Sequence, residues 1–199
     1  MELLRRFLYE QVNPNTTAVS ADILLNACPS FVGAISVFKS TIAHFYAPSD
    51  LCGAGGMYRE RICSNPNWRR EYAHYDTMFV ETDAGLNGMP GMAIGHARLF
   101  FSLKFRGKEY SCALVHWLVP FDELNKDTGM WVVQPEFQGN GRRTLSIIPL
   151  DCVARAAHLL PVYGSSFSPE DFHFADSLDV FMAYFVNPYI DHHSNEFLK

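Results

Sequence analysis

Basic side chains gather at two places in the sequence where they could bind the phosphate backbone of a nucleic acid. Arg98, Lys104 and Arg106 are separated by even numbers of residues along an apolar segment, and Lys108 follows the turn after it. If the segment is a strand, the first three side chains point to one face of a sheet. The run Trp68-Arg69-Arg70 adds a ring on which a base could stack. These residues are the predicted nucleic-acid-binding set, and the alternative is a solvated sheet face balanced by neighbouring acids.

A second candidate for chemistry is the run Asp191, His192 and His193 near the C-terminus, since carboxylate and imidazole groups are common ligands of zinc and iron. A metal site needs such ligands to converge from at least two elements, and adjacent residues on a helix point about 100° apart. No H-E-x-x-H motif is present. We therefore expect a capped, half-exposed terminal helix, with a metal-dependent hydrolase as the least favoured function.

The remaining candidates for catalysis do not form a recognisable centre. Cys112 and His116 are four residues apart on one predicted strand, which separates them by about 13 Å, too far for a thiolate–imidazole pair. No serine lies in a G-x-S-x-G motif. No spacing selects a two-metal triad from the acids Asp76, Asp83, Asp151 and Asp179. The sequence therefore predicts a protein that is not an enzyme and has no cofactor.

The composition indicates a globular protein rather than a disordered or membrane one. Of its 199 residues, 48% are hydrophobic and 19% are charged. The net charge of −5 means that any binding to nucleic acid must rest on a local patch. Five widely spaced cysteines without a C-x-x-C motif predict reduced thiols. Neither a secretory signal nor a membrane span is evident, so we expect an intracellular protein of the nucleus or cytoplasm.

The first part of the chain, residues 1–74, is predicted to be a mixed segment that packs on the core. Apolar residues at helical spacing predict a helix over residues 2–12. Residues 33–46 are long enough for a helix, but their β-branched side chains favour a strand, which we prefer. A short helix is predicted over residues 57–63.

The central part, residues 75–164, contains the strongest strand signals. After a strand at 75–82, a hairpin is predicted with its turn at Gly107-Lys108, of type II′. Its second strand is apolar on both faces and should therefore be central in the sheet. The core face of its first strand consists of Leu99, Phe101, Leu103 and Phe105.

The end of the chain adds further elements around this sheet. Asp151 is predicted to cap a short helix that runs to Ala157, and residues 159–163 form a closing strand. In residues 165–199, Asp176 is expected to begin one helix and Asn187-Pro188 a last one. The predicted fold is α+β: a small, mostly antiparallel twisted sheet or partly open SH3-like or BAH-like barrel over about 75–164. Helices from both ends of the chain flank it in one compact unit.

Several sequence blocks, in a fixed order, resemble one family. They include Phe45-Tyr-Ala-Pro-Ser-Asp50, residues 92–105, Cys112-Ala-Leu-Val-His-Trp117, residues 128–133, 150–159, 161–164, 176–179, 185–187 and 191–193. Together they span most of residues 30–196. The set resembles the C-terminal region of Plavaka-type, KDZ-related transposase proteins of fungi.

The resemblance implies descent from a DDE-type DNA transposase whose catalytic core lies upstream of the region seen here. No position of this chain matches a catalytic motif of that family. The favoured function is therefore a non-catalytic, transposon-derived fragment whose partner is DNA or a chromatin or transposase protein. The alternative is a nucleic-acid or chromatin-peptide binding module that uses the basic sheet face. The oligomeric state is left open.

Overall fold

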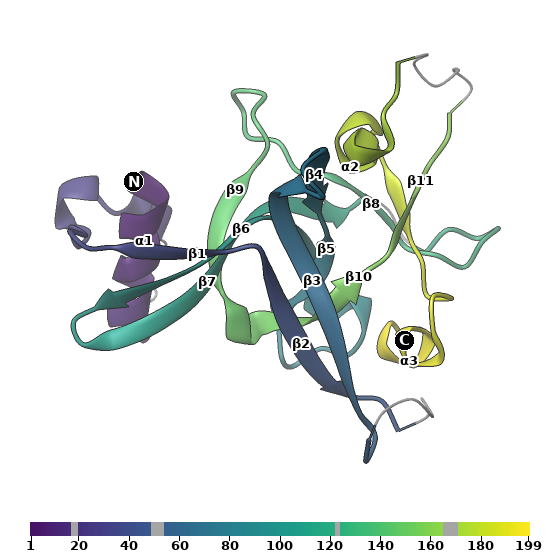
Figure 1. Ribbon diagram of the computed structural model, residues 1–199, viewed down its shortest axis with the longest axis horizontal. Coiled ribbons are helices and arrows are strands. Elements are labelled where there is room, and N and C mark those ends of the chain that lie inside the picture. The colour runs from purple at the N-terminus through teal and green to yellow at the C-terminus, as the bar shows by residue number, and fades with distance from the viewer. Residues whose placement is uncertain (17–19, 49–53, 122–123, 165–170) are drawn as a thin grey trace.

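The chain folds as an α+β protein whose mostly antiparallel strands form a nearly closed, barrel-like sheet, as the computed structural model in Figure 1 shows. The structure describes residues 1–16, 20–48, 54–121, 124–164 and 171–199. Helices from the two ends of the chain flank the sheet, so the predicted fold class is confirmed. None of the helices within these ranges has the length and apolar character needed to cross a bilayer.

The main sheet contains β7 at its centre, as the apolar character of both faces predicted. β7 pairs with β6, β8 and β9, all antiparallel. The main path through the sheet follows the order β10, β5, β6, β7, β8, β12, β11, and β1 pairs with β6 beside it. The strand bounds are β1 (Ile35–Phe38), β5 (Thr77–Glu81), β6 (Met92–Phe105), β7 (Lys108–Pro120), β8 (Val132–Pro135), β9 (Leu145–Pro149), β10 (Val153–Ala157), β11 (Leu159–Pro161) and β12 (Tyr184–Val186).

A second, three-stranded sheet consists of β2 (Ser40–Tyr46), β3 (Met57–Trp68) and β4 (Tyr72–Tyr75) in that order. The preference for strand in residues 33–46 is thus confirmed. The short helix predicted over 57–63 is wrong, because this segment pairs with β2 along its whole length. Exposed and partly buried side chains alternate from Met57 to Glu60, which is the period of a strand.

The hairpin of β6 and β7 is confirmed, but its turn lies one residue earlier than predicted. Phe105 pairs with Lys108, so Arg106 and Gly107 form the two-residue loop. Their φ angles are 51° and 81°, and positive φ at both positions identifies a type I′ turn rather than type II′. Arg106 therefore adopts a left-handed conformation that few residues other than glycine and asparagine tolerate well.

We expect Arg106→Asn to raise the free energy of unfolding by about 0.5 to 1 kcal/mol, because Asn-Gly is the preferred type I′ pair. Urea titration of the two proteins measures the change. Lys108→Asn is the control, since Lys108 lies on the strand and Asn there should bring no gain. An equal gain from both variants would mean that the turn conformation is not its source.

The helices are short, and α1 (Glu2–Val12) is the one that matches its prediction closely. The helix predicted from Asp151 to Ala157 is wrong: a single 3₁₀ turn leads directly into β10, which pairs with β5. The predicted last helix begins at its Asp191 cap rather than at Asn187. The other bounds are α2 (Ser177–Val180), α3 (His192–Phe197), and 3₁₀ turns at Ser20–Asp22, Leu25–Ala27, Met89–Gly91, Leu150–Cys152 and Phe174–Asp176.

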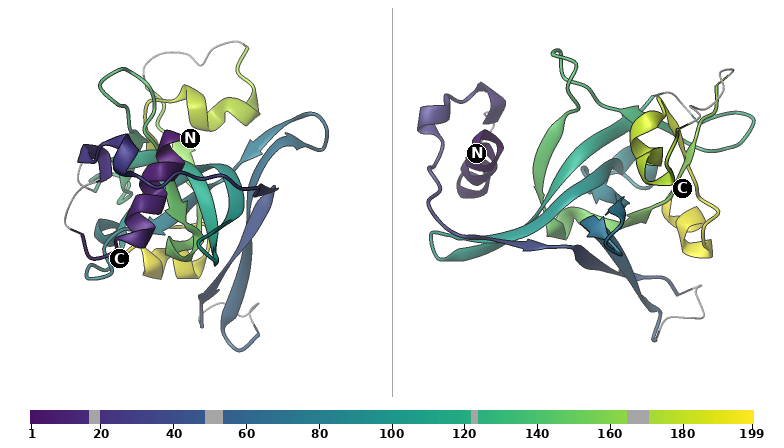
Figure 2. Two further views of the ribbon diagram at one scale, coloured as in Figure 1. Left: turned by 90° about the vertical axis from the view of Figure 1, so that its left-hand side faces the viewer. Right: turned by 45° about the horizontal axis from the view of Figure 1, so that its top comes forward.

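The core is built around the two faces of the β6–β7 hairpin. On one face, α1 places Leu4, Phe7 and Leu8 against Phe101 and Leu103, with the predicted core residues Leu99 and Phe105 packed beside them. Ala113 and Val115 point to the other face and belong to a second cluster around Phe100. A third cluster, around Phe79, includes Leu118, which lies on the same face of β7 as Cys112 of the first cluster. Figure 2 shows α1 and α3 at opposite ends of the molecule.

The three predicted segments share one sheet. Residues 1–74 contribute β1 to its edge, and residues 165–199 contribute β12, which lies between β8 and β11. The barrel-like sheet thus extends beyond both ends of the 75–164 region.

Candidate functional site

The predicted basic residues lie at two separate hairpin ends. Lys104, Arg106 and Lys108 are exposed at the tip of the β6–β7 hairpin, where Lys104 pairs across the strands with Glu109. Arg69-Arg70 form the exposed β3–β4 turn with φ angles of 54° and 66°. Figure 1 shows the first tip extending past α1 and the second turn close to α2. The structure therefore does not gather them into one patch.

Arg98 and Trp68, the other two members of the predicted set, already have partners within the chain. Arg98 lies at a register shift of the β6–β7 ladder, and its guanidinium packs over the Tyr75 ring, 4.3 Å from the centroid. The same group is 3.6 Å from the Asp179 carboxylate on α2. The Trp68 ring is half-buried and packs against His74, with centroids 5.1 Å apart. Both side chains therefore hold the fold together at these positions.

The run Asp191, His192 and His193 does not converge on a metal. Asp191 accepts the Ser194 N–H as the helix cap and is bound to the Arg155 guanidinium. That guanidinium lies 2.9 Å from Nδ1 of His193, where a cation would be repelled. His192 is 69% exposed and faces Glu196. The capped terminal helix is confirmed, and its side chains serve an ion-pair network.

Arg155 is the centre of that network and was not recognised as a core residue from the sequence. Its side chain is 2% exposed in β10. One guanidinium nitrogen donates to Asp191 at 3.1 Å, the Glu60 carboxylate lies 3.7 Å away, and the Phe45 ring covers the group at 4.6 Å. Burial opposes ionisation of Asp191, but the hydrogen bonds from Arg155 and Ser194 and the Arg155 charge lower its pKa to about 2. The network joins three distant segments of the chain.

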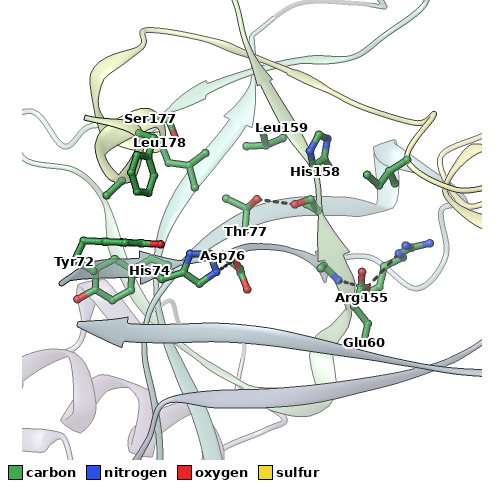
Figure 3. A pocket seen from close by; sticks show the side chains of 17 residues that line it. Glu60, Tyr72, His74, Asp76, Thr77, Arg155, His158, Leu159, Ser177 and Leu178 are labelled. Carbon is green, nitrogen blue, oxygen red and sulfur yellow. Dashed lines mark hydrogen bonds and ion pairs between the residues drawn. The ribbon is translucent and has the colours of Figure 1, made fainter. Parts of the chain in front are cut away.

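A half-open pocket of about 460 Å³ lies between β4, β10 and the segment that leads into α2. Figure 3 shows Tyr72, His74, Asp76, Thr77, His158 and Leu159 around it. The Tyr72 and Phe174 rings stand nearly perpendicular, at 85° with centroids 4.8 Å apart, and form an aromatic corner. Leu159 and Leu178 add apolar surface.

Two carboxylates, from Glu60 and Asp76, lie on the polar side of this pocket. Each is about one-quarter exposed. Burial raises the pKa of Glu60, although its hydrogen bond from the Ala156 N–H and the Arg155 charge act against the rise. Since Asp191 also neutralises Arg155, the lining of the pocket has more negative than positive charge from these groups.

Asp76 also belongs to a group that the sequence reading missed. Donor atoms of Cys63, His74 and Asp76 all lie within 4.8 Å of one another, and within the described ranges this is the group whose geometry could hold a metal ion. Burial and the neighbouring Asp76 raise the pKa of the Cys63 thiol. The other cysteines that the structure describes, Cys28, Cys112 and Cys152, are also free thiols, and Cys52 lies outside the described residues.

Comparison with known proteins adds no relative to this description. No family model, no curated protein and no solved structure matches the chain. The resemblance to Plavaka-type transposase proteins therefore stays a prediction from the sequence.

Proposed function

We propose that this protein is a non-catalytic binding module whose pocket takes the cationic side chain of a lysine-rich peptide. The observation that carries the proposal is the aromatic corner of Tyr72 and Phe174 beside the carboxylates of Glu60 and Asp76. Ammonium groups bind the faces of aromatic rings, and the attraction strengthens where the site is partly shielded from water. Carboxylates at the same pocket supply the opposite charge.

The shape of the pocket supports a side chain rather than an extended strand of nucleic acid. A volume of about 460 Å³ is sufficient for one side chain with part of its backbone. Nucleic-acid binding would instead need several cations along one groove. The exposed cations of the predicted set are divided between two hairpin ends, and Glu109 faces Lys104 across the ladder.

A cation over a tyrosine face already occurs next to the pocket. The Arg98 guanidinium rests on the Tyr75 ring at 4.3 Å, and Tyr75 is one of the residues that line the pocket. The arrangement illustrates the recognition that we propose for Tyr72. Because Arg98 is held on this ring, it is unsuitable as a contact for phosphate, although it belongs to the predicted nucleic-acid-binding set.

We expect a short alanine peptide with one central lysine to bind this pocket weakly, and trimethylation of the lysine to strengthen binding. Acetylation, which removes the charge, should abolish it. NMR titration of the labelled protein measures affinity and locates the perturbed residues. Tyr72→Ala should weaken binding roughly tenfold, the loss of about one cation–π contact.

Tyr189→Ala is the matched control, because Tyr189 is a similarly large ring, 66% exposed and outside this pocket. The proposal fails if the charged and acetylated peptides bind alike, or if Tyr189→Ala weakens binding as much as Tyr72→Ala. Binding of a DNA duplex that depends on Lys104 and Lys108, with no peptide binding, would favour the nucleic-acid alternative.

The origin and location of the module are also part of the proposal. The ordered sequence blocks support descent from a fungal transposase protein, without its catalytic core. The sequence contains no recognisable catalytic motif, which supports a binding rather than an enzymatic role. A lysine-rich chromatin peptide as the partner would place the protein in the nucleus, one of the two locations expected from the sequence.

A further inference from the structure

The β3–β4 hairpin places three metal-binding side chains on one face. Its ladder pairs Ser64 with Tyr75 and Asn65 with His74. Continuing that register by one residue puts Cys63 opposite Asp76. Since directly opposed residues share a face, and residues two apart share it too, Cys63, His74 and Asp76 lie together.

We propose that Cys63, His74 and Asp76 form a binding site for a divalent transition metal ion of the zinc type. The three donors are a sulfur, an imidazole nitrogen and a carboxylate oxygen, all within 4.8 Å of one another. Nε2 of His74 is 3.1 Å from Oδ1 of Asp76, a separation close to that of two ligands of one zinc ion. The Cys63 thiol would lose its proton to solvent as the metal–sulfur bond forms.

The surroundings hold two of these side chains in place before any metal arrives. The Cys63 N–H donates to Oδ2 of Asp76 at 2.6 Å, and the Asp76 N–H donates to the Cys63 carbonyl at 2.9 Å. Oδ2 is therefore engaged, while Oδ1 faces His74. The Trp68 ring packs on the imidazole of His74. Such outer contacts orient ligands and raise metal affinity.

The donor set selects the class of metal. One thiolate with one imidazole favours zinc and related ions over Mg²⁺ or Ca²⁺, which require oxygen ligands. Three protein ligands leave a fourth tetrahedral position. His74 and Asp76 both line the pocket, and the His74 side chain is 42% exposed, so the fourth position would be reached from the pocket side.

This site does not depend on the proposed peptide binding, but the two share Asp76. A metal ion bound to Asp76 would remove one of the carboxylates that attract a lysine side chain and would add positive charge nearby. We therefore expect zinc to weaken the binding of the lysine peptide, whereas the metal-free protein binds it.

Addition of Co²⁺ to the full 199-residue chain, reduced and freed of metal by a chelator, tests the proposal. We expect one ion per chain, with the intense near-ultraviolet absorption of a thiolate–cobalt bond, and its displacement by Zn²⁺. His74→Gln should weaken Zn²⁺ binding at least about 100-fold, because it removes a ligand rather than an outer contact. Since His74 is partly exposed, this variant should fold.

Cys152→Ser is the matched control, because Cys152 is a more exposed thiol outside the group and its loss should leave the cobalt absorption unchanged. Cys63→Ser should abolish that absorption. The proposal is overturned if no stoichiometric ion binds, or if binding survives His74→Gln and Cys63→Ser in folded protein. If the protein binds the lysine peptide but no metal ion, the metal site is contradicted and the proposed function is not.

Discussion

Replacement of Arg155 by methionine is expected to lower the free energy of unfolding by about 3 to 5 kcal/mol, the largest effect of any single change considered for this protein. Because methionine fills much of the same volume, the decrease in the free energy of unfolding arises from the missing charge rather than from a cavity. The variant leaves the carboxylates of Asp191 and Glu60 partly buried without their cation. An uncompensated buried charge is what makes the removal of one partner so costly.

The position of Arg155 in the fold explains why the effect should be global. Its partners come from β3, from the cap of α3 and, through Phe45, from β2, while Arg155 itself lies on β10 of the main sheet. The guanidinium thus ties the second sheet and the C-terminal helix to the barrel. Urea titration followed by tryptophan fluorescence measures the loss.

Two further variants separate the ion pair from general damage. Arg59→Met changes an exposed arginine of β3 and should shift stability by less than about 0.5 kcal/mol. Asp191→Asn keeps an oxygen that can cap α3 but removes the charge. In a double-mutant cycle, Arg155→Met and Asp191→Asn should be strongly non-additive. Additive losses would show that the two residues contribute independently and would refute the network.

The fold class could be predicted because its main signal is local. Alternation along residues 98–105 placed Leu99, Phe101, Leu103 and Phe105 on one face, and α1 covers that face. The second strand of the hairpin, β7, is apolar on both faces, and this correctly predicted its central position in the sheet. The errors arose where tertiary pairing overrode local signals. Residues 57–63 and 151–157 are compatible with a helix, but residues 57–63 pair with β2, and residues 153–157 pair with β5.

The candidate site could not be found from the sequence because its residues meet only through strand register. Cys63, His74 and Asp76 span fourteen positions with no metal-binding motif, and the helix predicted over 57–63 would have turned Cys63 away from the other two. The burial of Arg155 could not be predicted, because arginine is usually exposed and nothing local indicates its carboxylate partners 36 and 95 residues away. The basic residues were assigned to one surface because the register shift at Arg98 has no sequence signature.

His96 is expected to make the protein lose stability as the pH falls from about 6.5 to about 4. The ring is 2% exposed, and burial lowers its pKa from 6.5 to about 4; Asp179 opposes the shift, while Arg98, Arg143 and His116 add to it. Because the folded pKa lies below the unfolded one, the unfolded chain binds the proton more readily in this window. The contribution of His96 to the free energy of unfolding is therefore complete above pH 6.5, and about 3 kcal/mol of it is lost by pH 4.

The pH dependence of urea unfolding between pH 7.5 and pH 4.5 measures this loss. Glutamine cannot titrate, so in His96→Gln the free energy of unfolding should lose most of its dependence on pH. This holds whatever the stability of the variant at neutral pH. His192→Gln is the control, because this exposed ring should leave the slope unchanged. Asp191 does not confound the window, since its pKa of about 2 confines its loss to pH below about 4. A full slope in His96→Gln would mean that another group is responsible, and His116, whose pKa is also lowered by burial, would then be the residue to replace.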